Sequence, residues 1–218
     1  MYRVDLHTHS EASKDGGITA EQYAELLRNE TLDIIAITDH GRIDFALGMQ
    51  KALGGKRIIV GQEIDTSEGE IIGLFLKKQI DPGLSAEDTI AKIKNQGGVV
   101  YIPHPLETTR KGLQLNSLEM NMENIDIMET FNGRSFAQNF GPEAFAWARK
   151  NNIASAASSD AHGYKGAGNT YSILMEQPTR DNITKLLKTA KLTCKSPPMS
   201  SLLYPKLNRF KKLITGKG

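Results

Sequence analysis

The sequence has one cysteine, no long apolar run and few aromatic residues. Cys194 alone cannot form an internal disulfide or a thiolate zinc cluster. No stretch approaches the roughly 20 consecutive apolar residues of a membrane span, and Met1 leads into Val4-Asp5-Leu6-His7 without a basic and then apolar signal region. We therefore expect a cytoplasmic protein in a reducing environment. Aromatic residues make up only 6% of the chain, which leaves few platforms for stacking single-stranded nucleic acid.

Acidic residues are absent from residues 191–218, which carry seven basic side chains. The 218-residue chain has 27 basic and 25 acidic residues, so its body is mildly acidic and no nucleic-acid partner follows from net charge. Pro197 and Pro198 break the preceding segment. Apolar residues then recur at helical spacing, at Leu203, Leu207, Phe210 and Ile214.

This pattern predicts a basic amphipathic tail over residues 196–218, following a single domain over residues 1–195. The tail either packs on the outer wall of the domain or extends to an acidic partner, a nucleic acid or a membrane surface.

Short apolar runs alternate with helical stretches along the chain. The expected strands are Tyr2–Leu6, Leu32–Thr38, Arg57–Gly61, Ile71–Leu76, Gly98–Pro103, Ile125–Phe131, Ile153–Ser158 and Tyr171–Met175. Helix starts are expected at Thr19 with Gln22, at Ser85 with Asp88, near Pro142 and at Thr179. This alternation predicts an α/β fold with a parallel sheet. At least seven strands in about 190 residues favour a closed or nearly closed barrel.

All five histidines lie at or just beyond the C-terminal ends of expected strands. They are His7, His9, His40, His104 and His162. In a parallel βα barrel these strand ends meet at one face, where active sites form. The side chains of a His-x-His pair on a strand point to the same side, which suits chelation of one ion. The pattern therefore predicts one cleft that holds five imidazoles.

Carboxylates accompany the histidines. Glu63 follows the third strand, Asp160 follows a late strand, and Asp15 lies in the first loop. Nitrogen and oxygen ligands without sulfur suit zinc, manganese or iron. One ion takes about four protein ligands, so this set indicates a centre with more than one metal.

These residues resemble a known family. The runs His7-Thr8-His9-Ser10, Thr38-Asp39-His40, Gly61-Gln62-Glu63, His104-Pro105 and Ser159-Asp160-Ala161-His162 are similar to motifs of the polymerase and histidinol phosphatase (PHP) family of metal-dependent phosphoesterases. The resemblance covers residues 1–190 and implies a distorted (β/α)7 TIM-like barrel with up to three metal ions.

The resemblance also implies a set of ligands for each ion. The first ion would take His7, His9, Glu63 and Asp160. The second would share Glu63 and add His104 and one more residue, and the third would take Asp15, His40 and His162. Family members usually have a histidine where this chain has Glu70, so we expect Glu70 as the remaining ligand, with Glu68 a weaker candidate. A carboxylate there should favour manganese or iron.

The implied reaction is hydrolysis of a small phosphorylated molecule by a hydroxide shared between two metal ions. Glu63, Asp160 and His162 are its expected catalytic residues, and Arg134 in Phe131-Asn132-Gly133-Arg134 is the expected phosphate-binding residue. The loop cations Arg42, Arg110 and Lys165 are expected to be solvated. Alternatives are an amidohydrolase-type metal hydrolase and a metal-holding regulatory module without turnover. A nucleic acid is a less favoured partner, and the oligomeric state is not predicted. Because every metal-binding motif lies upstream of residues 196–218, we expect this tail to lie outside the active site and truncation after Lys195 to leave metal binding and turnover largely intact.

Overall fold

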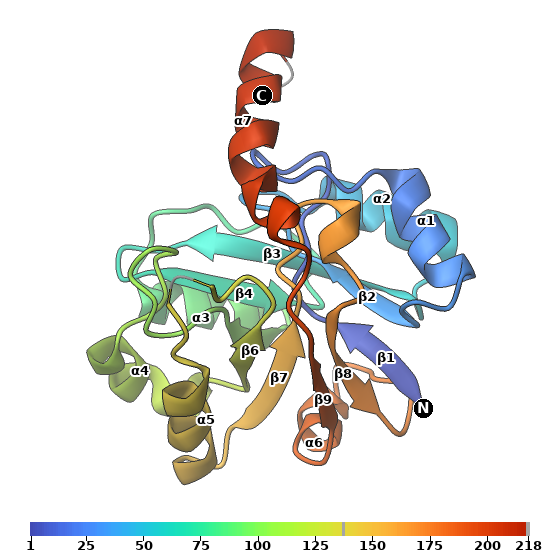
Figure 1. Cartoon of the computed structure of the whole chain (residues 1–218). Coiled ribbons are helices and arrows are strands. Elements are labelled where there is room, and N and C mark those ends of the chain that lie inside the picture. Colours follow the sequence, from blue (N-terminus) through green and yellow to red (C-terminus); the bar gives the residue numbers. More distant parts are fainter. Residues whose placement is uncertain (137, 217–218) are drawn as a thin grey trace.

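The computed structural model describes residues 1–136 and 138–216 and shows one nine-stranded sheet curved into a barrel (Figure 1). Its order is β7-β6-β5-β4-β3-β2-β1-β8-β9. The strands are β1 (Tyr2–Asp5), β2 (Ile34–Ile37), β3 (Ile58–Asp65), β4 (Glu70–Leu74), β5 (Val99–Ile102), β6 (Ile127–Asn132), β7 (Ala154–Ser158), β8 (Thr170–Leu174) and β9 (Lys191–Cys194). The Ser172 side chain of β8 contacts the backbone of Ala157 in β7, so the barrel nearly closes there.

The sheet is mixed, which corrects the prediction of a parallel sheet. Strands β1–β2, β2–β3, β5–β6 and β6–β7 pair in parallel, whereas β3–β4, β4–β5, β1–β8 and β8–β9 pair antiparallel. Residues 66–69, between β3 and β4, are too few for the helical crossover that a parallel pair needs. Strand β9 was not predicted, because its burial is only partial and its sequence does not alternate clearly.

Seven α-helices lie within the described residues. They are α1 (Ala20–Arg28), α2 (Asp44–Leu53), α3 (Ala86–Asn95), α4 (Leu115–Asn121), α5 (Gly141–Lys150), α6 (Ile183–Leu187) and α7 (Tyr204–Thr215). The capping box at Thr19 and the cap at Ser85 are both present as predicted. Helix α6 starts after Asn182 instead of at Thr179, because the Asn182 side chain accepts from the Thr179 backbone N–H in a turn before the helix.

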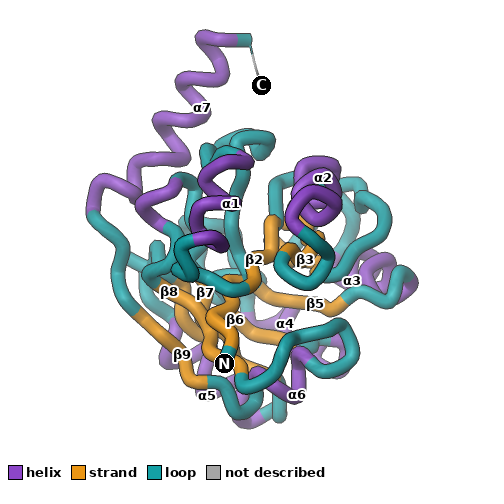
Figure 2. The backbone as a smooth tube through the Cα atoms, turned by 90° about the vertical axis from the view of Figure 1, so that its right-hand side faces the viewer, coloured by secondary structure: helices purple, strands orange, loops and turns teal. Residues whose placement is uncertain are grey.

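The core has two parts because side chains alternate across each strand. In β2, Ile35 and Ile37 belong to the layer that also contains apolar residues of α1, α2 and α3. Ile34 and Ala36 belong to the other layer, to which α6 contributes Ile183. Figure 2 shows α1, α2 and α3 outside the strands. The barrel thus has an apolar interior and an apolar layer beneath its helices.

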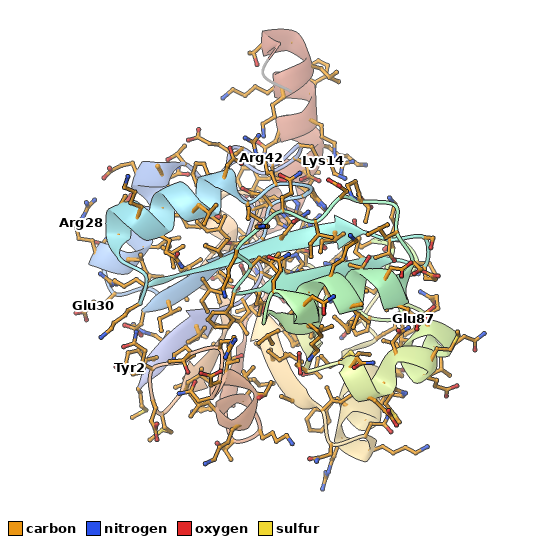
Figure 3. All side chains as sticks on the ribbon, turned by 180° about the vertical axis from the view of Figure 1, so that it is seen from behind. Tyr2, Lys14, Arg28, Glu30, Arg42 and Glu87 are labelled. Atoms are coloured by element: carbon orange, nitrogen blue, oxygen red, sulfur yellow. The ribbon has the colours of Figure 1, made fainter. Side chains whose placement is uncertain are left out.

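The two last helices lie at opposite ends of the barrel. Helix α6 lies at the lower end in Figure 1, and α7 stands on the upper end and projects away from the strands. Figure 3 places Lys14 and Arg42 near the base of α7. Among the described residues, no helix has both the length and the apolar character that a membrane crossing requires.

Candidate metal centre

The five histidines gather at the upper end of the barrel. His7 and His9 follow β1, while His40, His104 and His162 follow β2, β5 and β7. Each is buried or nearly so. Their positions beyond the strand ends agree with the sequence prediction, because β1, β2, β5 and β7 all run towards this end.

Two glutamates enter the site from the hairpin of β3 and β4. Glu63 lies within β3, opposite Ile72, since the strand runs beyond its expected end at Gly61. Strand β4 is antiparallel to β3, so its first residue, Glu70, lies at the same end of the barrel. The other candidate, Glu68, accepts a hydrogen bond from the Ala86 backbone at the start of α3 and is exposed.

The first group of ligand atoms surrounds the Nε2 atoms of His7 and His9, which are 3.1 Å apart. Glu63 Oε2 lies 3.3 Å from the former and 3.2 Å from the latter. Asp160 Oδ1 lies 3.5 and 3.4 Å from the same two atoms. These four side chains are the set expected for the first ion.

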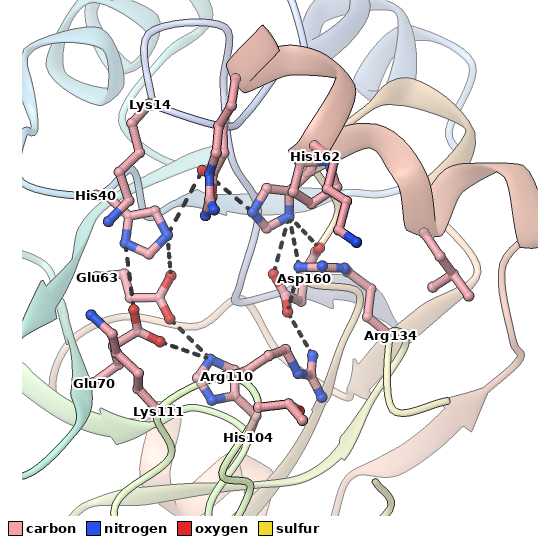
Figure 4. A pocket seen from close by; sticks show the side chains of 16 residues that line it. Lys14, His40, Glu63, Glu70, His104, Arg110, Lys111, Arg134, Asp160 and His162 are labelled. Atoms are coloured by element: carbon pink, nitrogen blue, oxygen red, sulfur yellow. Dashed lines mark hydrogen bonds and ion pairs between the residues drawn. The ribbon is translucent and has the colours of Figure 1, made fainter. Parts of the chain in front are cut away.

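Two more groups adjoin the first. Glu63 Oε1 lies 3.1 Å from His104 Nε2, and Glu70 Oε2 lies 3.6 Å from that atom. In the third group, Asp15 Oδ1 lies 3.5 Å from His162 Nε2 and 3.8 Å from His40 Nε2. His9 also offers an atom to this third group. Figure 4 shows His40 next to Glu63 and Glu70 of the second group, with His162 across the pocket from them.

The geometry of the first group fits a bound cation. His7 Nδ1 contacts Glu129 Oε1 at 3.1 Å, which leaves Nε2 to face His9 Nε2 and two carboxylate oxygens. Ligands with bonds of about 2.0 Å around a tetrahedral ion are themselves about 3.3 Å apart. Within the described residues, the Nδ1 atoms of His9 and His104 are buried and have no hydrogen-bond partner. The clusters are therefore consistent with a multi-metal site.

Burial shifts the pKa values of several candidate metal ligands. It lowers the pKa of His40 to about 4 and that of His162 to about 3, so both rings are neutral at pH 7, as metal ligands must be. Burial, together with the charges of Glu63 and Asp65, raises the pKa of Glu70 to about 9. Burial also opposes protonation of His9, but contacts with Asp160 and Glu63 outweigh it and raise the pKa of His9 to about 9.

Two arginines hold the outer oxygen of Asp160. Arg110 Nη1 donates to Asp160 Oδ2 at 2.8 Å, and Arg134 Nη1 donates to it at 3.2 Å. Arg110 also pairs with Glu107, so the expectation that Arg110 is solvated was wrong. Sequence alone did not reveal this contact, because residues 106–113 form an irregular loop that returns Arg110 to the site.

Glu129 contacts two of the candidate ligands, His7 and His104. Glu129 Oε2 accepts from the His104 backbone N–H at 2.6 Å, while its other oxygen contacts His7 and the Tyr101 hydroxyl. His104 and Asp160 have φ angles of 29° and 50°. Non-glycine residues rarely adopt this left-handed region, and such strain concentrates at functional sites.

Helix α7 borders this site, so the expectation that the tail lies outside it was wrong. Arg209 Nη2 lies 2.6 Å from Asp15 Oδ2. Pro205, Lys206 and Arg209 line the same cavity as the metal-ligand candidates. The amphipathic helix itself was predicted, but spacing along a helix does not reveal which part of the barrel its polar face contacts. Lys165 and Arg42 do not line this cavity.

Comparison with known proteins identifies the family. The model of the PHP domain matches residues 5–187. This chain belongs to the PHP domain family. The expected family and the barrel that it implies are thus confirmed, with the mixed sheet as the form that the distortion takes in this PHP domain.

Three relatives show the extent of the similarity. The PHP domain chain is 32% identical over 149 residues to an uncharacterized protein of Methanocaldococcus jannaschii, covering 63% of this chain and 87% of the relative. It is 31% identical to another uncharacterized protein of that organism, over 78% of this chain and 69% of the relative. It also resembles a two-domain protein from Bacteroides vulgatus containing a predicted PHP-like metal-dependent phosphoesterase. That match has a TM-score of 0.69 and 20% identity and covers 95% of this chain and 69% of the other.

Proposed function

We propose that this PHP domain is a metal-dependent phosphoesterase that hydrolyses a small phosphorylated molecule, such as a nucleotide or a sugar phosphate. Two or three divalent ions of zinc, manganese or iron would be held by His7, His9, Asp15, His40, Glu63, Glu70, His104, Asp160 and His162. Bound there, they would supply a water nucleophile near neutral pH and neutralise phosphoryl charge. Membership of the PHP family and the likeness to a phosphoesterase-like structure support this proposal.

The observation that carries the proposal is a ring of cations around the buried ligands. A cavity of about 620 Å³ has His40, Glu63, His104 and Asp160 among its lining residues, which is a suitable size for a small organic ligand. The cations that line it are Lys14, Arg110, Lys111, Arg134, Lys206 and Arg209. A phosphate ester is an anion and gains from this ring, whereas a neutral amide does not. The ring therefore favours phosphoester over amide hydrolysis.

Arg134 is the residue that we propose binds the phosphoryl group. Its Nη1 contacts Asp160 and His162, each at 3.2 Å. The side chain also lines the cavity. A guanidinium in this position can donate to a non-bridging phosphoryl oxygen while it still touches Asp160. Glu63, which faces histidines through both oxygens, would bridge two ions.

The experiment is a substrate screen with metal-analysed protein. Phosphomonoesters, phosphodiesters, carboxylic esters and amides are offered to protein stripped with a chelator and then reloaded with manganese or zinc. We expect metal-dependent release of phosphate from monoesters. Preferential cleavage of amides would support the amidohydrolase alternative, and no turnover of any class by metal-loaded protein would support a regulatory module.

A further inference from the structure

The C-terminal helix binds the loop that carries Asp15. Lys212 Nζ donates to the backbone carbonyls of Glu11, Ser13 and Gly16, at 2.8 Å for the first and 3.0 Å for the last. These contacts join α7 to a loop nearly 200 residues earlier in the sequence. One lysine thus binds three carbonyl oxygens within a segment of six residues.

Asn208, one turn before Lys212, links two of the expected ligands. Its Nδ2 donates to the carbonyl oxygen of Asp15 and to that of His162, both at 2.9 Å. The same side chain fills the space beside Gly17, where an added Cβ would lie 2.8 Å from Asn208 Nδ2. The backbone positions of Asp15 and His162 are therefore fixed relative to each other through α7.

Arg209 acts on the carboxylate itself. Its Nη2 lies 2.6 Å from Asp15 Oδ2, while Asp15 Oδ1 faces His40 and His162. Asp160 divides its oxygens in the same way, with Oδ2 on arginines and Oδ1 towards histidines. An arginine on one oxygen fixes the rotation of the carboxylate and keeps its other oxygen directed at the imidazoles.

The opposite face of α7 is open to solvent. Leu207, Phe210 and Ile214 are 56%, 64% and 69% exposed. The helix projects from the barrel (Figure 1), so its polar residues provide much of its attachment. Those contacts reach the Asp15 loop and His162, which concentrates the effect of α7 on one group of ligands.

We propose that α7 is part of the metal centre and that Arg209 is a positioning residue that orients Asp15 for metal binding. This inference depends on the proposed function only in assuming that the clusters bind metal. In this proposal, the C-terminal helix orders the group of side chains formed by Asp15, His40 and His162. The ions near His7, His9, Glu63 and His104 would bind without its help.

The test compares full-length variants stripped with a chelator and titrated with Mn²⁺, with free Mn²⁺ followed by electron paramagnetic resonance. Arg209→Gln removes the charge, Arg209→Lys keeps it, and Lys211→Gln is the matched control. Lys211 is exposed and lies two residues, or about 200°, around the helix from Arg209. The melting temperature of each metal-free variant is measured in parallel.

We expect Arg209→Gln to weaken one class of Mn²⁺ sites by about 10- to 100-fold while the other sites are unchanged. Arg209→Lys should recover part of the loss, and Lys211→Gln should match the parent chain. Equal Mn²⁺ binding by Arg209→Gln and the parent would overturn the inference. Uniform weakening of all sites together with a lower melting temperature would also overturn it, by showing a general structural role. A parent chain that binds no metal would instead overturn the proposed function.

Discussion

Two buried aspartates at the site each divide their oxygens between imidazoles and guanidinium groups. Asp160 is held by Arg110 and Arg134, and Asp15 by Arg209. The arginines offset part of the negative charge that the carboxylates bring into the pocket. They also fix the direction in which each carboxylate can bind a cation. At this scale the clustering of the histidines and carboxylates could be predicted from sequence, but their contacts with arginines could not: Arg134 was expected at the site only to bind phosphate, and Arg110 and Arg209 were not expected there.

Replacing Arg134 tests its proposed part in phosphate binding. In Arg134→Ala, kcat/KM for a phosphomonoester should fall by about 100-fold because one donor to the phosphoryl group is lost. Metal content should stay the same, since Arg110 still holds Asp160 Oδ2. Steady-state kinetics and elemental analysis measure both. Arg28→Ala, which removes an exposed partner of Glu21 on α1 (Figure 3), is the control. Loss of metal, or unchanged kinetics, would contradict this role.

At the scale of elements, the reversal of β4 decides which glutamate enters the site. A parallel strand would place its first residue at the opposite end of the barrel. The antiparallel hairpin instead returns Glu70 to the same end as Glu63, while Glu68 remains in the turn. The hairpin was missed because β4 reads as a short apolar run, which does not reveal its direction. Only the family resemblance indicated Glu70.

Metal binding by Glu70 should release a proton. The pKa of Glu70 is raised to about 9, so the metal-free protein holds a proton there at pH 7, whereas a coordinated carboxylate holds none. Because Glu70 must lose this proton before it can bind a cation, metal affinity should rise with pH up to about pH 9. The proton from Glu70 adds to the one that His9 releases, since the pKa of His9 is also raised to about 9. Calorimetry at pH 7 in two buffers of different ionisation enthalpy counts these protons.

The Glu70→Gln variant should release about one proton fewer than the parent chain. Glu68→Gln, two residues away with its carboxylate at the start of α3, should release the same number as the parent. If Glu70→Gln and the parent release equal numbers of protons, Glu70 does not bind metal as an ionised carboxylate.

At the scale of the whole molecule, sequence predicted the barrel and the end at which the site forms. Strong local signals sufficed for this: the caps at Thr19 and Ser85, the buried strands, and histidines at strand ends. Three features depend on contacts between distant segments and could not be predicted from local pattern. These are the antiparallel strands, the return of Arg110, and the docking of α7 across almost the full length of the chain.

The docking of α7 on the Asp15 loop reverses the expected effect of removing the C-terminal tail. Because Asn208, Arg209 and Lys212 contact the Asp15 loop, removal of the tail should weaken metal binding instead of leaving it intact. The boundary at residue 195 therefore does not separate the site from the rest of the chain. The residues that sequence predicted are mainly the candidate metal ligands, and Arg110 and Arg209, whose contacts it missed, touch two of these candidates, Asp160 and Asp15.

The most direct test of the account is the rate of phosphate release from a phosphomonoester as Mn²⁺ is added to metal-free protein, with bound Mn²⁺ measured at each step. We predict little release at the first equivalent and a steep rise as the second binds, because in the proposed centre two ions would share Glu63. Glu63→Gln should bind fewer ions and stay inactive, whereas Glu87→Gln, at an exposed position of α3, should behave as the parent chain. Phosphate release that is complete in metal-free protein, or absent at every metal loading, would contradict the account.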